Sequence, residues 1–130
     1  MTPRRRRDER GAAVVDFVLV LLLLLPLFFG LLQLGLVLHV RNTLTAAASE
    51  GARYGAAYDR SPAAGAARTR DQIRGALAGK YAREVSARLE AVGGAPTVVV
   101  RARAEVPTLG FLGPSVSLEA EGHATREVFP

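Results

Sequence analysis

The sequence has 130 residues, a formal net charge of +5 and no cysteine. The lack of cysteine excludes disulfide bonds and thiolate metal sites, and the two histidines are too few for a histidine metal cluster. The sequence also lacks the Walker A, GxGxxG, HExxH and GxSxG motifs. We therefore expect a protein that is not an enzyme, holds no cofactor or metal and takes no small-molecule substrate.

Basic residues are concentrated at the N-terminus, in the segment MTPRRRRDER. Residues 1–10 contain five arginines against two acidic side chains, Asp8 and Glu9. The arginines directly precede an apolar stretch, and clusters of this kind mark the cytoplasmic side of a membrane span. We interpret the cluster as a disordered cytoplasmic anchor that lies along anionic lipid headgroups, and not as a nucleic-acid-binding segment.

The apolar stretch dominates the first third of the chain. From Phe17 to Leu38 it runs for 22 residues without a charged side chain, and Gln33 is its only polar member. As a helix with a rise of about 1.5 Å per residue it would extend roughly 33 Å, enough to cross a hydrocarbon core of about 30 Å. The sequence therefore predicts a single-pass protein of the cell membrane in contact with the lipid bilayer. Its N-terminus is expected in the cytoplasm and its C-terminal domain outside.

Three residues inside the span interrupt its apolar composition. Pro26 removes one backbone hydrogen bond and favours a kink, which membrane helices tolerate. Gly30 lets another helix approach closely, and the Gln33 amide can form a hydrogen bond across such a contact. We predict that Pro26, Gly30 and Gln33 form a helix-packing position within the bilayer. A lone, tolerated glutamine is the simpler alternative.

The most informative local pattern lies at the front of the span, in the segment GAAVVDF. Gly11 is followed, after four small apolar residues, by one acid, Asp16, and then by Phe17. A carboxylate inside hydrocarbon costs about 2.5–3.5 kcal/mol on insertion scales. At the N-terminus of a helix a carboxylate is instead favoured by the helix dipole. We therefore expect Asp16 at the level of the lipid headgroups.

This segment resembles the processing site of type IV prepilin-like proteins. Its continuation, with a proline, a glycine and a polar residue spaced along the helix, resembles the TadE-like pseudopilins of tight-adherence (Flp-type) pilus systems. The resemblance implies that a prepilin peptidase cuts after Gly11, so that Ala12 becomes the first mature residue, Asp16 the fifth and Phe17 the sixth. It also implies that the Asp16 carboxylate pairs with the N-terminus of a neighbouring pilin or pseudopilin subunit. The family usually has Glu where this chain has Asp16.

Two other interpretations of the N-terminal region remain open at this point. The chain could be an unprocessed single-pass anchor that carries a scaffold or binding module. Alternatively, signal peptidase could cut near Ala48, within an alanine triplet, and release a secreted domain. The length of the apolar run, about twice that of an ordinary signal-peptide core, argues against the second alternative.

The region after the span has helical composition, interrupted once. Residues 41–60 are rich in alanine, and we expect them to extend the membrane helix and to end near residue 60. A break follows at Pro62, and either Ser61 or Thr69 is predicted to cap the next helix. In residues 67–92 apolar side chains recur at steps of three and four, which predicts one amphipathic helix packed on a sheet. The stripe consists of Ile73, Leu77, Tyr81, Val85, Leu89 and Val92.

The last third of the chain alternates between apolar and polar residues. Residues 97–106 and 115–129 each have the two-residue period of a half-buried strand. The loop of residues 107–114 between them predicts an antiparallel hairpin, and its Leu109, Phe111 and Leu112 could contact a partner, the membrane surface or the core. The outer face of the hairpin should pair two arginines with two glutamates. These four residues are Arg101, Arg103, Glu119 and Glu121.

Together these patterns predict an α+β protein. It begins with a basic cytoplasmic leader (1–11) and a transmembrane helix (12–40). A helix extension (41–60) and a small extracytoplasmic domain (61–130) follow. In that domain one amphipathic helix packs on a two-stranded antiparallel hairpin.

Overall fold

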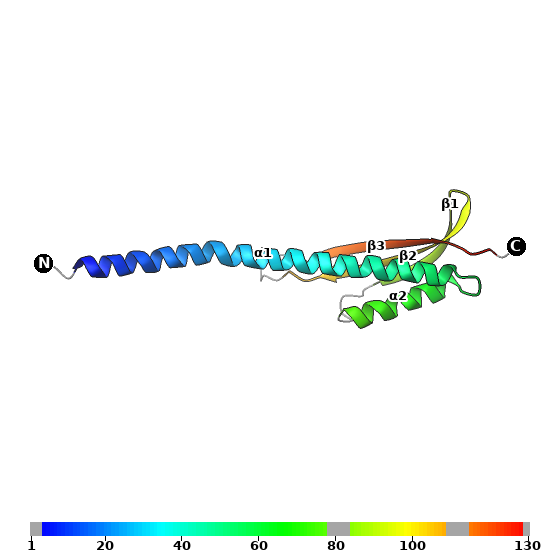
Figure 1. Cartoon of the computed structure of the whole chain (residues 1–130), viewed down its shortest axis with the longest axis horizontal. Helices are drawn as coiled ribbons and strands as arrows, with labels where there is room; N and C mark the ends of the chain where they lie inside the picture. The colour runs from blue at the N-terminus through cyan, green and yellow to red at the C-terminus, as the bar shows by residue number, and fades with distance from the viewer. Residues whose placement is uncertain (1–3, 78–83, 109–114, 129–130) are drawn as a thin grey trace. The chain divides into compact units, whose positions relative to one another are not determined.

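The computed structural model describes residues 4–77, 84–108 and 115–128 and divides into two compact units, Met1–Gly35 and Leu36–Pro130. The first helix contributes its N-terminal part to the first unit and its C-terminal part to the second. The elements in chain order are α1 (Arg4–Ala56), α2 (Pro62–Ala76), β1 (Glu84–Val92), β2 (Ala95–Val106) and β3 (Val116–Thr125) (Figure 1).

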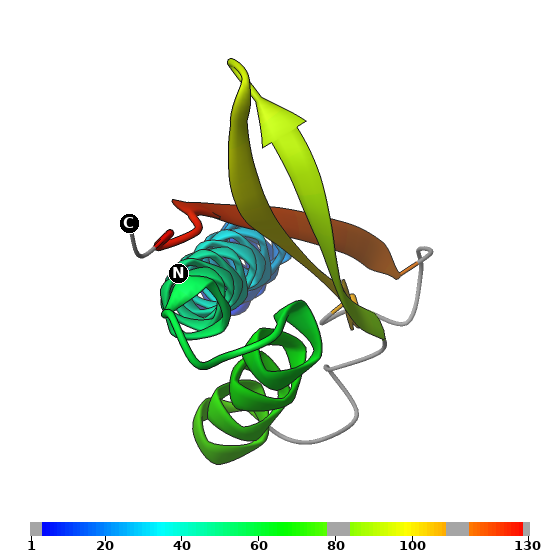
Figure 2. The same ribbon diagram turned by 90° about the vertical axis from the view of Figure 1, so that its right-hand side faces the viewer.

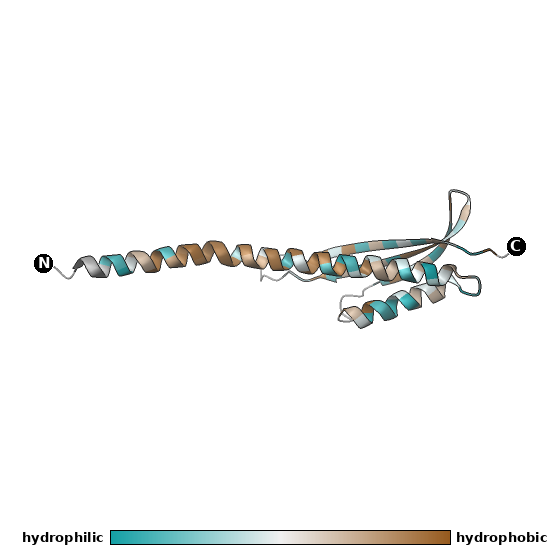
Figure 3. Ribbon diagram, viewed as in Figure 1, coloured by the Kyte–Doolittle hydropathy of each residue, from teal (hydrophilic) through white to brown (hydrophobic). Residues whose placement is uncertain are grey.

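In the first unit, the apolar side chains of α1 are not covered by protein. All large hydrophobic side chains from Val14 to Leu34 are exposed, by 39% to 73%. Figure 3 shows that hydrophobic residues predominate along this part of the helix. The helix is long and apolar enough to cross a membrane, and none of its most apolar window is buried inside the protein. An uncovered apolar surface of this length is typical of a segment that faces lipid.

The start of α1 corrects one prediction about the basic segment. The helix begins at Arg4, so residues 4–10 are helical rather than disordered. Arginine and glutamate are good helix formers, and a helix that is already nucleated in the apolar run extends into such residues at little cost.

The second unit is a three-stranded antiparallel sheet in the order β1-β2-β3, with α2 and the C-terminal part of α1 packed on one face (Figure 2). Small aliphatic side chains make up its core, so the helices approach the sheet closely. The same helix that exposes its apolar surface in the first unit therefore supplies the core of the second. The largest fully buried side chains are Leu44, Ile73, Val40, Val98, Val99, Val100, Val106 and Thr69.

The α+β class is confirmed, but the sheet has three strands and not the two predicted. The predicted helix 67–92 is wrong beyond Ala76, because Glu84–Val92 forms β1 and pairs with β2. A spacing of four residues between Val85 and Leu89 fits the face of a strand as well as that of a helix. Gly93 and Gly94, directly after the predicted helix, form the two-residue turn of the β1–β2 hairpin. Their φ values of +60° and +83° are those of such turns. Tyr81 of the predicted stripe lies outside the described residues.

The break before α2 is short. α1 ends at Ala56, four residues before the predicted end, and α2 starts already at Pro62. Ser61 is the N-cap of α2, and its Oγ accepts a hydrogen bond of 3.2 Å from the backbone N–H of Ala64. This confirms Ser61 as the cap, whereas Thr69 lies buried inside the helix. Proline suits the first position of a helix because its missing N–H is not needed there.

The two predicted strands are confirmed as β2 and β3, paired in antiparallel fashion. Arg101 forms ion pairs with Glu119 at 3.0 Å and with Glu121, as the alternation predicted. The hydrogen bond from Arg101 lowers the pKa of the Glu121 carboxyl and raises the pKa of the guanidinium. Arg103 instead donates to the Ser117 hydroxyl, at 3.1 Å. The apolar loop residues Leu109, Phe111 and Leu112 lie outside the described residues.

Candidate functional site

The predicted processing segment lies on α1 in the first unit. Gly11, Ala12, Asp16 and Phe17 are all helical and exposed. An added Cβ at Gly11 would meet nothing within 4 Å, so no other described part of the chain covers this residue. Glycine inside a helix costs about 1 kcal/mol relative to alanine, which eases local unwinding at this position.

The spacing of the segment places two of its residues on the same face. Ala12 and Asp16 are four residues apart in one helix, so their side chains are neighbours one turn apart. Cleavage after Gly11 would create an ammonium group at Ala12, within a turn of the Asp16 carboxylate. The two opposite charges then compensate each other at the start of the helix, where the dipole also favours the acid.

The predicted packing position in the bilayer lies further along the same helix. α1 is continuous through Pro26, which has no N–H to donate to the carbonyl of Leu22. Gly30 has open space around it, since an added Cβ would meet nothing within 4 Å. Gln33 is half-buried. The packing role of these three residues in the bilayer stays a prediction about other subunits.

The structure reveals a close helix crossing in the second unit that sequence reasoning missed. α1 and α2 cross where Gly51 and Gly55 of α1 face Gly65 of α2. A Cβ added at Gly65 would lie 2.5 Å from the Gly51 carbonyl oxygen and 3.2 Å from the Gly55 Cα. The spacing of Gly51 and Gly55, four residues apart, was the available signal.

Polar side chains fix the register of this crossing. The Thr69 hydroxyl contacts the carbonyl oxygens of Gly65 at 2.9 Å and of Ala47 at 3.3 Å. Arg68 donates to a Glu50 carboxylate oxygen at 3.1 Å. Buried polar groups need such partners, so the hydroxyl favours one alignment of α2 along α1.

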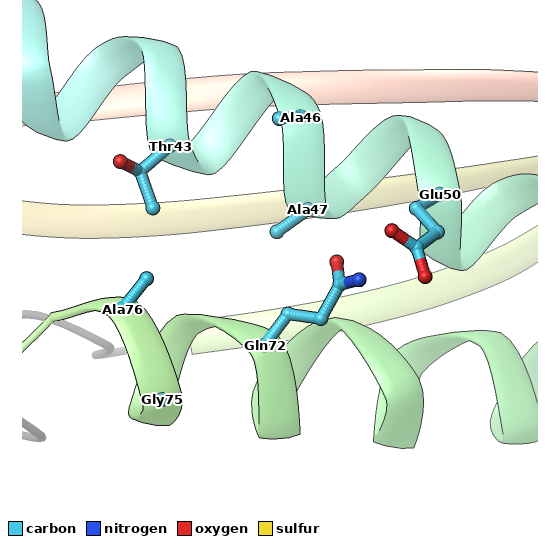
Figure 4. A pocket seen from close by; sticks show the side chains of 7 residues that line it. All are labelled: Thr43, Ala46, Ala47, Glu50, Gln72, Gly75 and Ala76. Carbon is cyan, nitrogen blue, oxygen red and sulfur yellow. The ribbon is translucent and has the colours of Figure 1, made fainter.

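Beside the crossing lies an open groove of about 420 Å³ between α1 and α2 (Figure 4). Its walls are small side chains, with the Glu50 carboxylate and the Gln72 amide pointing toward each other at one end. The hydrogen bond from Gln72, followed by that from Arg68, lowers the pKa of Glu50. Glu50 is thus engaged in holding the two helices together. The groove is lined by Thr43, Ala46, Ala47, Glu50, Gln72, Gly75 and Ala76.

A second close approach joins α1 to the sheet. A Cβ added at Gly122 of β3 would meet backbone atoms of Ala48 and Ser49 in α1. Only glycine fits at this distance. Alanines of α1, Ala48, Ala52 and Ala56, form one core cluster with Val98 and Val100 of β2. The C-terminal part of α1 therefore packs against both α2 and β3.

Residues 11–53 match the family model described as TadE-like protein. This segment is TadE-like. The match confirms the resemblance over these residues, and it begins at Gly11, the residue before the predicted cleavage point. No curated protein and no solved structure gives a significant match to the chain.

The TadE-like segment covers both environments of α1. It includes the exposed apolar run of the first unit and ends three residues before the helix does, at Ala56. Together with the one uncovered apolar helix in the described residues, it identifies a single-pass membrane protein. The segment also includes the part of α1 that fills the core of the second unit, whereas α2 and the sheet lie outside the match.

Proposed function

We propose that this chain is a minor pseudopilin, a non-enzymatic membrane subunit that takes part in assembling a tight-adherence pilus or a related secretion apparatus. The observation that carries the proposal is the TadE-like segment that starts at Gly11 and places Asp16 five residues later. In this proposal a prepilin peptidase removes residues 1–11 at the cytoplasmic face. The mature helix then associates with other pilin or pseudopilin subunits, and the second unit lies outside the cytoplasm.

The geometry of α1 supports this proposal. The residues of the processing segment are exposed within the described chain, as a peptidase substrate must be. The apolar run beyond it is uncovered, and so is available to lipid or to neighbouring helices. The arginines before Gly11 favour a cytoplasmic N-terminus, on the side where prepilin peptidases cut by the family resemblance.

The packing of α1 argues against release of a secreted domain near Ala48. Ala48 is fully buried, and Val40 and Leu44, which precede it, are both 0% exposed in the core. Cleavage there would cut through the middle of α1 and remove these side chains from the second unit. Loss of several buried aliphatic groups costs about 2–5 kcal/mol each for large residues, so the released piece would not hold its fold.

Replacing Asp16 by alanine tests the assembly role. We expect Asp16→Ala to insert into membranes normally but to be absent from purified filaments, because the mutant lacks the carboxylate that pairs with a neighbouring N-terminus. Immunoblots of membranes and of sheared filaments measure the two pools.

Asp16→Glu is the matched control, since it keeps the charge and has the acid usual in the family. We expect it to enter filaments at least as well as the unchanged chain. Normal incorporation of Asp16→Ala would show that the carboxylate has no part in assembly.

A further inference from the structure

The outer edge of β1 is an open strand edge. In the sheet order β1-β2-β3, β1 pairs with β2 on one side, and no described strand pairs with its other side. The hairpin turn at Gly93 and Gly94 is closed by the pair Val92 and Ala95. In a two-residue hairpin this closing pair is hydrogen-bonded, so every second residue of β1 counted from Val92 bonds to β2. The residues between them, Ala87, Leu89 and Ala91, direct their backbone N–H and C=O groups outward.

One contact confirms this alternation and limits the open edge. Arg70 of α2 donates a hydrogen bond of 2.8 Å to the carbonyl oxygen of Val85, which by the same count points outward. α2 therefore occupies the edge at the start of β1. The edge is open only from Ala87 onward, and all residues from Arg88 to Val92 are exposed.

The open edge is apolar on one face. On this face the Leu89 side chain is 48% exposed. Val92 lies on the opposite face, with Arg88 and Glu90. Val85 and Ala87, on the same face as Leu89, pack against the core. Leu89 is nearer the hairpin turn and is not among the residues packed against that core. A strand edge with an exposed leucine is a template for pairing with another strand.

The other face of the edge carries charges that fit a second copy of the same strand. Consider antiparallel pairing about a two-fold axis at Leu89, so that Leu89 faces Leu89 and Ala87 faces Ala91 of the second copy. Arg88 then lies opposite Glu90 of the second copy, and Glu90 lies opposite its Arg88. Within one chain these two side chains already form an ion pair of 2.9 Å, so each charge would gain a second opposite neighbour. The outward backbone groups supply about six hydrogen bonds in this register.

The orientation of the hairpin within the second unit suits two copies whose C-terminal parts of α1 are parallel. Figures 1 and 2 show the end of the β1–β2 hairpin turned across the direction of the C-terminal part of α1, and projecting away from α2. Figure 2, viewed along α1, shows the flat face of the β1 ribbon. A two-fold axis perpendicular to that face runs along the C-terminal part of α1, so it relates two copies in which this part of the helix points the same way.

From these observations we infer that β1 is a homotypic docking edge: residues 87–91 pair antiparallel with the same residues of a second copy, centred on Leu89. The contact joins the two three-stranded sheets into one. It goes beyond the proposed pseudopilin function and does not depend on cleavage after Gly11, so either can fail without the other.

Disulfide formation in the full-length chain in membranes tests the register. Because the chain has no cysteine, Leu89→Cys reports one position only. Opposed residues of a hydrogen-bonded pair have Cα atoms about 5.5 Å apart, within disulfide range. We expect copper–phenanthroline to convert most of this variant into a dimer.

Two exposed positions of the same strand are the matched controls. Ser86→Cys and Val92→Cys would each lie about 20 Å from their own copies in this register, so we expect at least tenfold less dimer from either. Equal dimer formation at all three positions would indicate random collision and overturn the proposal. Absence of dimer from Leu89→Cys, with the thiol reactive toward maleimide, would overturn it as well.

A charge exchange separates contacts between chains from contacts within a chain. Arg88→Glu and Glu90→Arg, each combined with Leu89→Cys, place like charges opposite each other in a homodimer, and we expect severalfold less disulfide. Co-expressing the two variants with different tags brings the glutamate introduced in one chain opposite the arginine introduced in the other. We expect the disulfide between the two differently tagged chains to form about as readily as in Leu89→Cys alone. The ion pair between positions 88 and 90 within each chain remains broken in both variants. Failure of the mixed dimer to exceed the two homodimers would contradict the proposed pairing.

Discussion

Replacing Gly122 by valine is expected to lower the free energy of unfolding of the second unit by about 3 kcal/mol. The atoms nearest to the added Cβ are backbone atoms of Ala48 and Ser49, which cannot rotate aside as a side chain can. To admit the new group, β3 must move away from α1, and the contact of Ala48 and Ala52 with Val98 loosens. A small domain is stable by about 5–15 kcal/mol, so this is a large fraction of its stability.

Hydrogen exchange on the full chain in detergent measures this effect. Amides of β2 and β3 should lose protection in Gly122→Val, whereas amides of the apolar run in α1 should keep it. Ser117→Val, on the exposed face of the same strand, is the control and should change stability by less than about 0.5 kcal/mol. Unchanged protection in Gly122→Val would mean that β3 does not lie against α1 as described.

Replacing Gly65 by valine should likewise destabilise the second unit by about 3 kcal/mol, by forcing α2 away from α1. The added Cβ would lie 2.5 Å from the carbonyl oxygen of Gly51, a backbone atom held within a helix. Separation of the helices also removes the contact of the Thr69 hydroxyl with the Ala47 carbonyl oxygen, at 3.3 Å. Thermal unfolding followed by circular dichroism measures the loss.

The same helix offers a matched control for this prediction. An added Cβ at Gly75 would meet nothing within 4 Å, so Gly75→Val changes composition in the same way without a clash. We expect Gly75→Val to be neutral or slightly stabilising, since valine is a better helix former than glycine. Equal destabilisation by the two variants would trace the effect to helix propensity and not to the crossing.

Local patterns predicted those parts of the fold in which one period dominates. The uncharged run from Phe17 to Leu38 predicted one long apolar helix, which is part of α1. The alternation in residues 97–106 predicted both β2 and the ion pairs of Arg101. β1 was missed because Val85 and Leu89 satisfy both the helical and the strand period. The Gly93–Gly94 pair also marks a helix end as readily as a hairpin turn.

The close contacts could not be predicted because their partners lie far apart in the sequence. Nothing near Gly122 indicates that Ala48, more than 70 residues earlier, will lie against it. The four-residue spacing of Gly51 and Gly55 is visible in the sequence. The sequence does not indicate that Gly65 of α2 will face them. The processing segment differs from these contacts, because Gly11 and Asp16 were identified by resemblance to a family. Their expected partners are other molecules, so the structure of one chain shows only that the two residues are exposed.

The central claim, that the TadE-like segment is cut after Gly11, is tested most directly by mass spectrometry of the N-terminus of the chain in native membranes. We expect a mature protein that begins at Ala12, with Asp16 as its fifth residue. A chain that retains residues 1–11 would contradict the claim and favour an unprocessed anchor. A chain that begins at Ser49 would contradict it in favour of a secreted domain.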